Sequence, residues 1–189
     1  MILSTRFEQA LTYAAILHSG QVKKGTAVPY IGHLLTVTGI ALEHGADEDE
    51  AIAALLHDAV EDAGGKGRLA DIRGRFGERV ATIVEGCTDT DVAPKPDWSE
   101  RKRQYVEHLR QEENPSVLLV CVSDKLANTR AILGDYRQIG EEVWKRFSGG
   151  REGTLWYYRE MAAAVRRSGS DPLADELDRV VRQMNRMAL

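Results

Sequence analysis

The sequence has few cysteines, and their placement argues against two kinds of stabilised site. Cys87 and Cys121 are the only two, they lie far apart, and neither belongs to a CxxC pair. A disulfide framework needs several cysteines, and a cysteine-bound zinc site needs them in close pairs. We therefore expect neither kind of site, and we expect Cys121, which lies in an apolar run, to be a reduced core residue.

Long apolar runs and a surplus of positive charge are also missing. The longest apolar runs, residues 51–56 and 117–122, are far shorter than the roughly 20 residues of a membrane-spanning helix. Residues 1–20 lack the order of a signal peptide. The net charge is −4 and the charges are interleaved, so no basic surface for nucleic acid or anionic membranes is predicted. We expect a cytoplasmic protein that binds neither, and the sequence gives no signal of its oligomeric state.

Length and composition are those of one folded domain. The 189 residues are 43% hydrophobic and 29% charged, within the range of globular proteins. A chain of this length can bury a sizeable core but is short for two ordinary domains. We expect a single domain over residues 1–189.

Apolar residues recur at three- and four-residue steps along most of the chain, and no stretch alternates as a strand does. Capping residues, glycines and prolines mark the ends of these patterns. Residues 89–97 contain two prolines and indicate a surface loop. We expect an all-α fold, a helical bundle of about nine helices. These span approximately residues 5–18, 30–44, 47–64, 68–76, 78–88, 99–110, 115–136, 152–167 and 172–187.

The third of these helices has a densely charged end. Residues 51–64 read AIAALLHDAVEDAG, and their first half is apolar on all sides, as in a buried helix. On a continuous helix His57 and Glu61 share one face, and Asp58 and Asp62 share the next. A buried carboxylate needs a cation, a metal or a wet cleft. A helix whose charged end simply lies in solvent explains the segment equally well.

Two more polar residues interrupt apolar helical patterns. His33 lies between Tyr-Ile and Leu-Leu pairs, and Asp124 follows shortly after residues 117–122. Each alone is more often a core or cap residue than a ligand. With His57 and Asp58 they supply two imidazoles and two carboxylates, a set that suits Mn²⁺, Fe²⁺ or Zn²⁺ and leaves positions open for water and substrate.

Hydrolysis of a phosphoester or phosphoanhydride is the chemistry that such a set predicts. A metal lowers the pKa of a bound water and polarises a phosphoryl oxygen. Glu61 and Asp62, one turn further along the expected helix, are placed to orient that water or to shuttle its proton.

These residues and their surroundings resemble a known family. The ordered set His33, His57-Asp58 and Asp124 is similar to the HD-superfamily metal-dependent phosphohydrolases. The segments GQVKKGTAVPYIGH, AALLHDAVED, FGERVATIVEGCTD, ERKRQYVEHL and SDKLANTRAIL resemble, in this order, the hydrolase domain of the RelA/SpoT-homologue enzymes. The likeness covers about residues 18–133, with a weaker one near GTLWYYREMAAAV at residues 153–165, and the helices of residues 152–187 would complete the fold. Since no synthetase domain fits in this length, the chain most resembles the stand-alone small alarmone hydrolases.

The resemblance implies an Mn²⁺-dependent 3′-pyrophosphohydrolase of nucleotide alarmones, (p)ppGpp or (pp)pApp, with other divalent transition metals as alternatives. Its partner would be a small-molecule nucleotide substrate. Asn128 would contact the nucleoside, and Tyr157 would stack on the base unless it is a core aromatic. The metal ligands and water-activating residues that the resemblance implies are His33, His57, Asp58, Asp124, Glu61 and Asp62.

Two further groups are implied as substrate contacts. Lys23, Lys24 and Thr26 occupy the family's basic loop and would meet the base or the phosphates; a solvated loop is the alternative. Arg151, at a glycine-rich helix start, would hold an anion with the free N–H groups there, unless it is merely an exposed arginine.

Departures from the family pattern affect the nucleoside pocket rather than the metal set. Ala127 replaces the usual histidine, Ala131 replaces a small hydroxyl residue, and the basic loop reads KKGT instead of RKSG. A pocket that loses hydrogen-bonding groups relaxes or changes its base choice. The sequence therefore leaves the choice between guanine and adenine alarmones open.

Two other functions remain open at this point. A phosphatase acting on another nucleotide, such as NADPH, would use the same metal chemistry with different pocket contacts. A non-catalytic alarmone-binding protein would keep the pocket without turnover, but such a protein has no need for Glu61 and Asp62 beside the metal.

Overall fold

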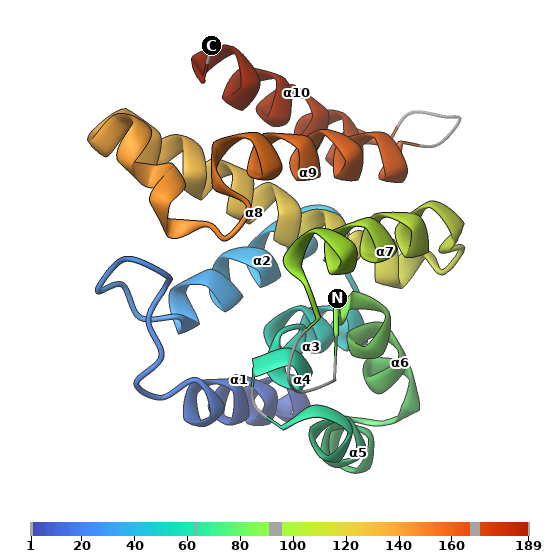
Figure 1. Ribbon diagram of the computed structural model, residues 1–189. Helices are drawn as coiled ribbons and strands as arrows, with labels where there is room; N and C mark the ends of the chain where they lie inside the picture. The colour runs from blue at the N-terminus through green and yellow to red at the C-terminus, as the bar shows by residue number, and fades with distance from the viewer. Residues whose placement is uncertain (1, 63, 91–95, 167–170, 189) are drawn as a thin grey trace.

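Helices make up the regular structure of the chain in this computed structural model. The part of the chain that it describes, residues 2–62, 64–90, 96–166 and 171–188, contains no strand beyond an isolated bridge between Val22 and Pro29. The expected all-α class is confirmed (Figure 1). These residues form the α-helices α1 (Thr5–Leu17), α2 (Ile31–Glu43), α3 (Glu48–Leu56), α4 (Ala59–Asp62), α5 (Gly65–Phe76), α6 (Glu78–Cys87), α7 (Trp98–Gln111), α8 (Pro115–Ile139), α9 (Gly150–Val165) and α10 (Pro172–Met187), and the 3-10 helix η1 (Gly140–Arg146).

Helix α8 is the centre of the fold. It is 25 residues long and contacts α2, α3 and α6 as well as α9, α10 and η1 (Figure 1). Asn114 caps it by accepting a hydrogen bond from the Ser116 N–H at 3.0 Å, and Pro115 occupies its first turn, where a missing N–H costs nothing. Because neighbours cover it on several sides, Asp124 in its middle is only 6% exposed.

Helix α3 begins at a capping box and is buried along most of its length. The side chain of Asp47 accepts from the Glu50 N–H, and the side chain of Glu50 accepts from the Asp47 N–H. Every residue from Ala51 to Leu56 is buried. The expected buried helix is therefore present, and its C-terminal end points its next residues into the protein interior.

The continuous helix expected through residue 64 is wrong at one place. Helix α3 ends at Leu56 and α4 begins at Ala59, with His57 and Asp58 in a turn between them. The Nδ1 atom of His57 lies 2.9 Å from the Ala54 carbonyl oxygen, close to the place where a continuing helix would bring the N–H of residue 58. Because α3 and α4 are separate helices, His57 and Glu61 do not share the face of one helix.

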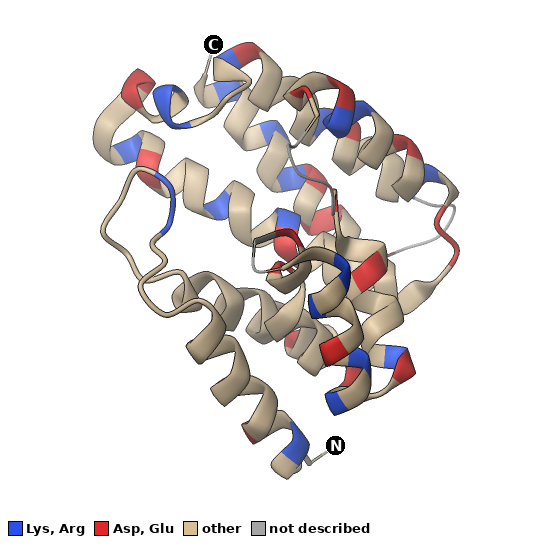
Figure 2. Ribbon diagram, turned by 60° about the horizontal axis from the view of Figure 1, so that its bottom comes forward, with Lys and Arg blue, Asp and Glu red and all other residues tan. Residues whose placement is uncertain are grey.

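Charged residues of both signs are interspersed over the helices (Figure 2). Arg6 and Arg79, for example, pair with the acidic first turn of α3 and its cap. Among the described helices, none has the length and apolar composition that a bilayer-crossing segment requires. The buried apolar side chains instead form one cluster shared by helices from both ends of the chain.

Candidate metal centre and cavity

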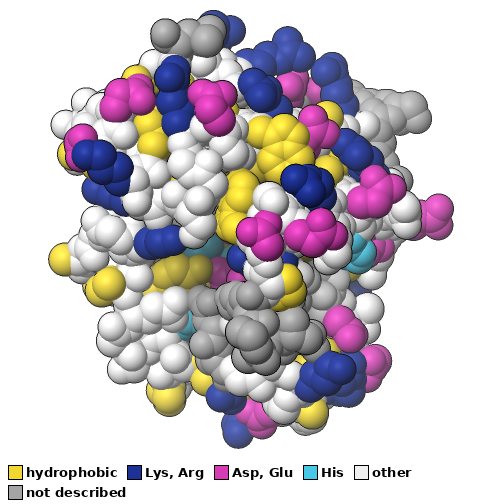
Figure 3. Space-filling view, in the orientation of Figure 1, with side chains coloured by type: hydrophobic (Ala, Val, Ile, Leu, Met, Phe, Trp, Pro, Cys, Tyr) yellow, Lys and Arg dark blue, Asp and Glu magenta, His cyan; other side chains and the backbone are white. Residues whose placement is uncertain are grey.

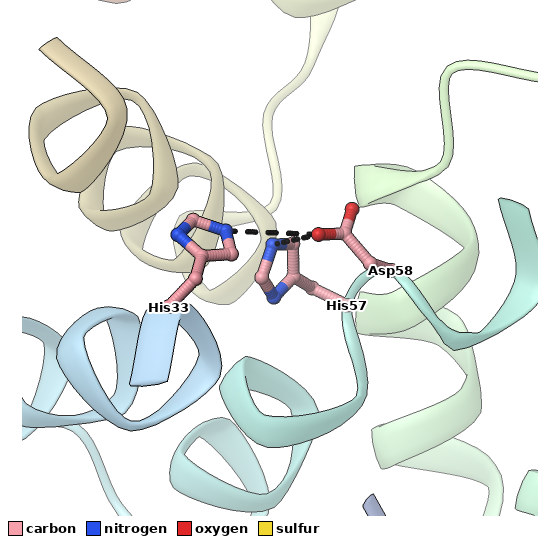
Figure 4. Close-up of side chains that lie close together, drawn as sticks. All are labelled: His33, His57 and Asp58. Carbon is pink, nitrogen blue, oxygen red and sulfur yellow. Dashed lines mark ion pairs between the residues drawn. The ribbon is translucent and has the colours of Figure 1, made fainter. Parts of the chain in front are cut away.

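Three side chains from two parts of the chain converge on one point. His33 lies in the first turn of α2, while His57 and Asp58 form the turn between α3 and α4 (Figure 4). The Oδ2 atom of Asp58 is 3.0 Å from His57 Nε2 and 3.6 Å from His33 Nε2. One ligand atom from each residue lies within 4.8 Å of the others, which is the spacing of ligands around a single metal ion.

Asp124 approaches the same point from α8. Its Oδ1 atom is 3.2 Å from His33 Nε2 and 3.5 Å from His57 Nε2. The same carboxylate accepts hydrogen bonds from Lys125 Nζ and Asn128 Nδ2, each at 2.5 Å. The structure thus brings together all four residues that the sequence singled out as metal ligands.

The two histidines are buried between carboxylates, and this changes their titration. Burial lowers the pKa of His57, but the charges of Asp58 and Asp124 outweigh burial and raise the pKa well above its usual value. Burial likewise opposes the protonated form of His33, yet hydrogen bonds with the same two carboxylates raise its pKa. Without a bound cation, the acids around these rings favour their protonated form.

The carboxylates shift in the opposite direction. Burial raises the pKa of Asp58, but the charge of His57 and hydrogen bonding with His33 lower it well below its usual range. Burial also disfavours ionised Asp124, and the neighbouring Lys125 charge outweighs it, so the pKa of Asp124 is well below its usual range too. Tyr30 donates a hydrogen bond to Asp58 Oδ2. Both acids therefore present ionised oxygens.

The donor set fits a divalent metal ion. His57 Nε2 is buried and makes no hydrogen bond among the described residues, although carboxylate oxygens face it. Its Nδ1 bonds to a backbone carbonyl, which is a typical outer contact of a metal-ligating histidine. Two neutral imidazole nitrogens and two carboxylates match the ligand preferences of first-row divalent metals.

A cavity of about 300 Å³ opens beside this cluster. In the space-filling view, histidine and acidic side chains are seen at the bottom of a hollow on the face shown (Figure 3). Cations and aromatic rings make up much of the wall. Its charged lining residues are Asp58, Glu61, Asp124, Lys24, Arg101, Lys102 and Lys125. Its aromatic lining residues are Tyr30, Trp98, Phe147, Tyr157 and Tyr158. The cavity can therefore hold a polyanion with an aromatic base near the ligand cluster.

The first turns of α7 and α9 shape one side of the cavity. A Cβ atom added to Gly149 would lie 2.4 Å from the Trp98 ring, and one added to Gly153 would lie 3.0 Å from it. Because these glycines have no side chains, the indole can lie against the start of α9. There the centre of its ring is 6.4 Å from the centre of the Tyr157 ring. Burial raises the pKa of the Tyr157 hydroxyl, so this residue stays neutral.

The structure places the residues proposed to contact the substrate in different surroundings. Lys24, Asn128 and Tyr157 line the cavity, as does Glu61. Asp62 is the last residue of α4, but its side chain lies outside the described residues.

Three others are absent from the described lining of the cavity. The Thr26 hydroxyl bonds within its own loop, donating to the Lys23 carbonyl at 2.8 Å. Arg151 Nε lies 3.9 Å from Glu141 Oε2. Lys23 pairs with Asp135 near the end of α8, at 3.6 Å.

Asp135 also binds a second cation. Arg146 of η1 donates to its Oδ2 atom at 2.8 Å. The aliphatic part of Arg146 lies against Gly25, where an added Cβ would be 2.7 Å from it, and Gly25 has a φ of +72° that other residues rarely adopt. The loop before α2 is thus fastened to α8 and η1.

Sequence reasoning missed several parts of the site. Tyr30, Lys125, Arg101 and Lys102 all line the cavity, but a tyrosine or a lysine or arginine on a helix is usually a packing or surface residue, so the sequence alone does not single them out. Cys121 is buried and free as expected. Its sulfur nevertheless lies only 3.2 Å from that of Cys87, a proximity that the folding of α6 against α8 creates.

Comparisons with known proteins agree with this geometry. A family model described as "HD domain" matches residues 10–155. HD domains are metal-dependent, and the His/Asp cluster lies within the match. A zebrafish (Danio rerio) protein named guanosine-3′,5′-bis(diphosphate) 3′-pyrophosphohydrolase MESH1 is 38% identical over 139 residues, which cover 72% of each chain.

Two further matches differ in how much of the other protein they cover. A protein of Aquifex aeolicus named guanosine-3′,5′-bis(diphosphate) 3′-pyrophosphohydrolase is 38% identical over 126 residues, but these are only 17% of its length and 66% of this chain. A solved structure described as "A metazoan ortholog of SpoT hydrolyzes ppGpp and plays a role in starvation responses" matches with a TM-score of 0.78 and 27% identity. That match covers 100% of this chain and 99% of the other.

Proposed function

Because the chain belongs to the HD domain family, we propose that it is a metal-dependent hydrolase that removes pyrophosphate from the 3′ position of a nucleotide alarmone, (p)ppGpp or (pp)pApp. The observation that carries the proposal is the convergence of two imidazoles and two carboxylates beside a cavity with a cationic and aromatic wall. The names of the zebrafish and Aquifex relatives support the substrate class.

His33, His57, Asp58 and Asp124 would hold the metal. Mn²⁺ suits this mixed nitrogen and oxygen set, and other divalent transition metals are alternatives. When bound, the metal supplies a Lewis acid for the phosphoryl oxygen and lowers the pKa of the attacking water. Asn128 and Lys125 hold the Asp124 carboxylate through hydrogen bonds, and Tyr30 does the same for Asp58.

Glu61 would take the proton from the attacking water. It lines the cavity beside Asp58 and is only partly exposed, so its carboxylate can accept a hydrogen bond from a water that faces the substrate. We assign Asp62 to the same task as its neighbour in sequence.

The nucleotide would lie along the cationic and aromatic lining of the cavity. Lys24 and Asn128 would contact the sugar or phosphates, and Tyr157 would pack against the base. The Asn128 amide nitrogen already donates to Asp124, so its side-chain oxygen is the atom left to accept from the substrate. Lys23 and Thr26 would shape the loop that presents Lys24. For Arg151, near Glu141, we propose an anion contact at the start of α9.

Pyrophosphate release tests the proposal. Protein loaded with Mn²⁺ is incubated with ppGpp and with pppApp, and phosphorus NMR measures free pyrophosphate and the remaining nucleotide. We expect release from at least one of them and none with Asp58→Asn. Metal-loaded protein that leaves both nucleotides intact would contradict the proposal, and the ratio of the two rates assigns the preferred base.

A further inference from the structure

We propose that Asp89 is a positioning residue, which holds Arg101 and Lys102 side by side on the cavity wall as the binding site for the substrate's pyrophosphate group. The identity of this anion rests on the proposed function. Asp89 itself is absent from the described lining of the cavity, whereas both cations belong to that lining. Asp89 therefore acts on the substrate only through them.

One oxygen of Asp89 binds both cations. Its Oδ2 atom accepts from an Arg101 guanidinium nitrogen at 2.5 Å and from Lys102 Nζ at 2.6 Å. The side chains are 5%, 12% and 18% exposed for Asp89, Arg101 and Lys102. Asp89 follows the end of α6, and the two cations lie near the N-terminal end of α7, so this contact links the end of one helix to the beginning of the other.

The two cations keep donors for a ligand. Arg101 Nε is buried and has no hydrogen-bond partner among the described residues. The nitrogen of Arg101 that binds Asp89 is also 3.8 Å from Glu61 Oε1, so the guanidinium lies between the proposed base and Asp89. Lys102 has three N–H donors, and its ammonium lies 5.0 Å from the centre of the Tyr157 ring. A pyrophosphate group offers the acceptors that this pair requires.

The pKa of Lys102 is lowered overall, and the acid behind the pair opposes this loss of charge. Burial lowers the pKa of Lys102, and the nearby charge of Lys125 lowers it further, while Asp89 and Glu61 act in the opposite direction. Two adjacent cations also repel each other, and a shared carboxylate offsets that repulsion. The pair can therefore remain in place before the substrate arrives.

Calorimetric titration with inorganic pyrophosphate tests the inference. It uses metal-free protein, so that chelation of the metal by pyrophosphate does not contribute. Asp89→Asn keeps the shape of the side chain and removes its charge, Asp89→Glu restores the charge, and Glu160→Gln is the matched control. Glu160 pairs with Arg110 on α7 at 2.5 Å, but it is outside the cavity lining.

We expect Asp89→Asn to weaken pyrophosphate binding about tenfold, the loss of roughly one charge-assisted contact. The affinity of Asp89→Glu for pyrophosphate should stay within about threefold of wild type, which in free energy is less than half of the effect of Asp89→Asn. The affinity of Glu160→Gln should match wild type. In the metal-loaded enzyme, KM for the nucleotide should rise while kcat changes little, because ground-state and transition-state binding fall together.

Circular dichroism first establishes that each variant is folded. A folded Asp89→Asn protein with wild-type affinity for pyrophosphate would overturn the inference, as would wild-type protein that binds no pyrophosphate. If Asp89→Asn does not fold, an Asp89→Glu protein that loses affinity more than tenfold overturns it, and one that keeps affinity supports it. If wild-type protein binds pyrophosphate but hydrolyses neither alarmone, the proposed reaction is wrong and the proposed anion site still stands.

Discussion

The Nδ1 atom of His57 lies 2.9 Å from the carbonyl oxygen of Ala54. A carbonyl oxygen only accepts hydrogen bonds, so Nδ1 carries the proton in the neutral ring and the lone pair is on Nε2. That atom is the one buried 3.0 Å from the Asp58 carboxylate. This contact at the end of α3 thus prepares His57 to bind a metal.

Removing one carboxylate of the cluster should remove metal binding. Asp58→Asn leaves three ligands, and we expect Mn²⁺ affinity to fall by more than about 100-fold, beyond the loss typical of an outer contact. Calorimetric titration with Mn²⁺ measures it. Glu107→Gln, which alters an exposed pair on α7, is the control. Unchanged affinity in Asp58→Asn would exclude this residue as a ligand.

Glu61 should affect the rate without affecting the metal. Its proposed task is proton transfer, so we expect Glu61→Gln to bind Mn²⁺ as wild type does and to lose about 10²- to 10⁴-fold in kcat. Pyrophosphate release and metal titration on the same preparation separate the two effects. Full activity in this variant would remove the assigned role.

Metal binding should release protons. Although burial lowers the pKa values of His33 and His57, the carboxylates around them raise these values overall, so the metal-free rings hold protons more tightly than exposed histidines do. A metal must displace those protons, and its apparent affinity should therefore increase with rising pH. Titrations in buffers of different ionisation enthalpy count the protons released. A heat of binding that is the same in every buffer would contradict this expectation.

Two glycine substitutions should change stability in opposite directions. In Gly149→Ala the new methyl group collides with the Trp98 ring, and we expect a loss of about 1–3 kcal/mol from overpacking. Gly134 lies inside α8 with open space around it, so Gly134→Ala should gain about 0.5–1 kcal/mol. Urea unfolding of both variants measures the difference. If Gly149→Ala were as stable as wild type, the indole would move aside at no cost in free energy.

The cap of α3 should contribute stability only above acidic pH. Although burial opposes ionisation, hydrogen bonds from the Glu50 N–H and from Arg79 lower the pKa of Asp47 below its usual value of 3.8. As pH falls, Asp47 is protonated in the unfolded chain before it is protonated in the folded protein. The stabilisation that its lowered pKa provides above pH 3.8 is therefore lost as pH falls through the pKa of the folded protein. Asp47→Ala should cost about 1 kcal/mol at pH 7.

Unfolding measured at pH 7 and near pH 3 checks that dependence. The difference between wild type and Asp47→Ala should shrink at the lower pH. Asp47→Asn, which keeps a cap but loses the charge that binds Arg79, should lie between them at pH 7.

The all-α class and the members of the cluster could be predicted from the sequence because both depend on local pattern. His33 and Asp124 interrupt apolar helical runs, and a buried polar residue in such a run requires a partner. Helical periodicity gave the approximate bounds of α2 and α8, since burial of one face imposes it.

What could not be predicted depends on contacts that helical periodicity does not reveal. The sequence around His57 has the periodicity of a continuous helix, but in the structure α3 ends at Leu56, beside the contact of the His57 ring with the Ala54 carbonyl. Arg101 and Lys102 resemble any charged surface residues of a helix until Asp89 is seen beside them. The contact between Cys87 and Cys121 likewise depends on how α6 packs against α8.

The shared contact of Lys23 and Arg146 with Asp135 has a consequence for motion in the protein. The loop that carries Lys24 cannot detach from the end of α8 without breaking these ion pairs and exposing the Arg146 stem packed on Gly25. Segments joined in this way open together, as one cooperative unit. Amide hydrogens of the loop and of the last turns of α8 should therefore exchange with solvent at a common rate.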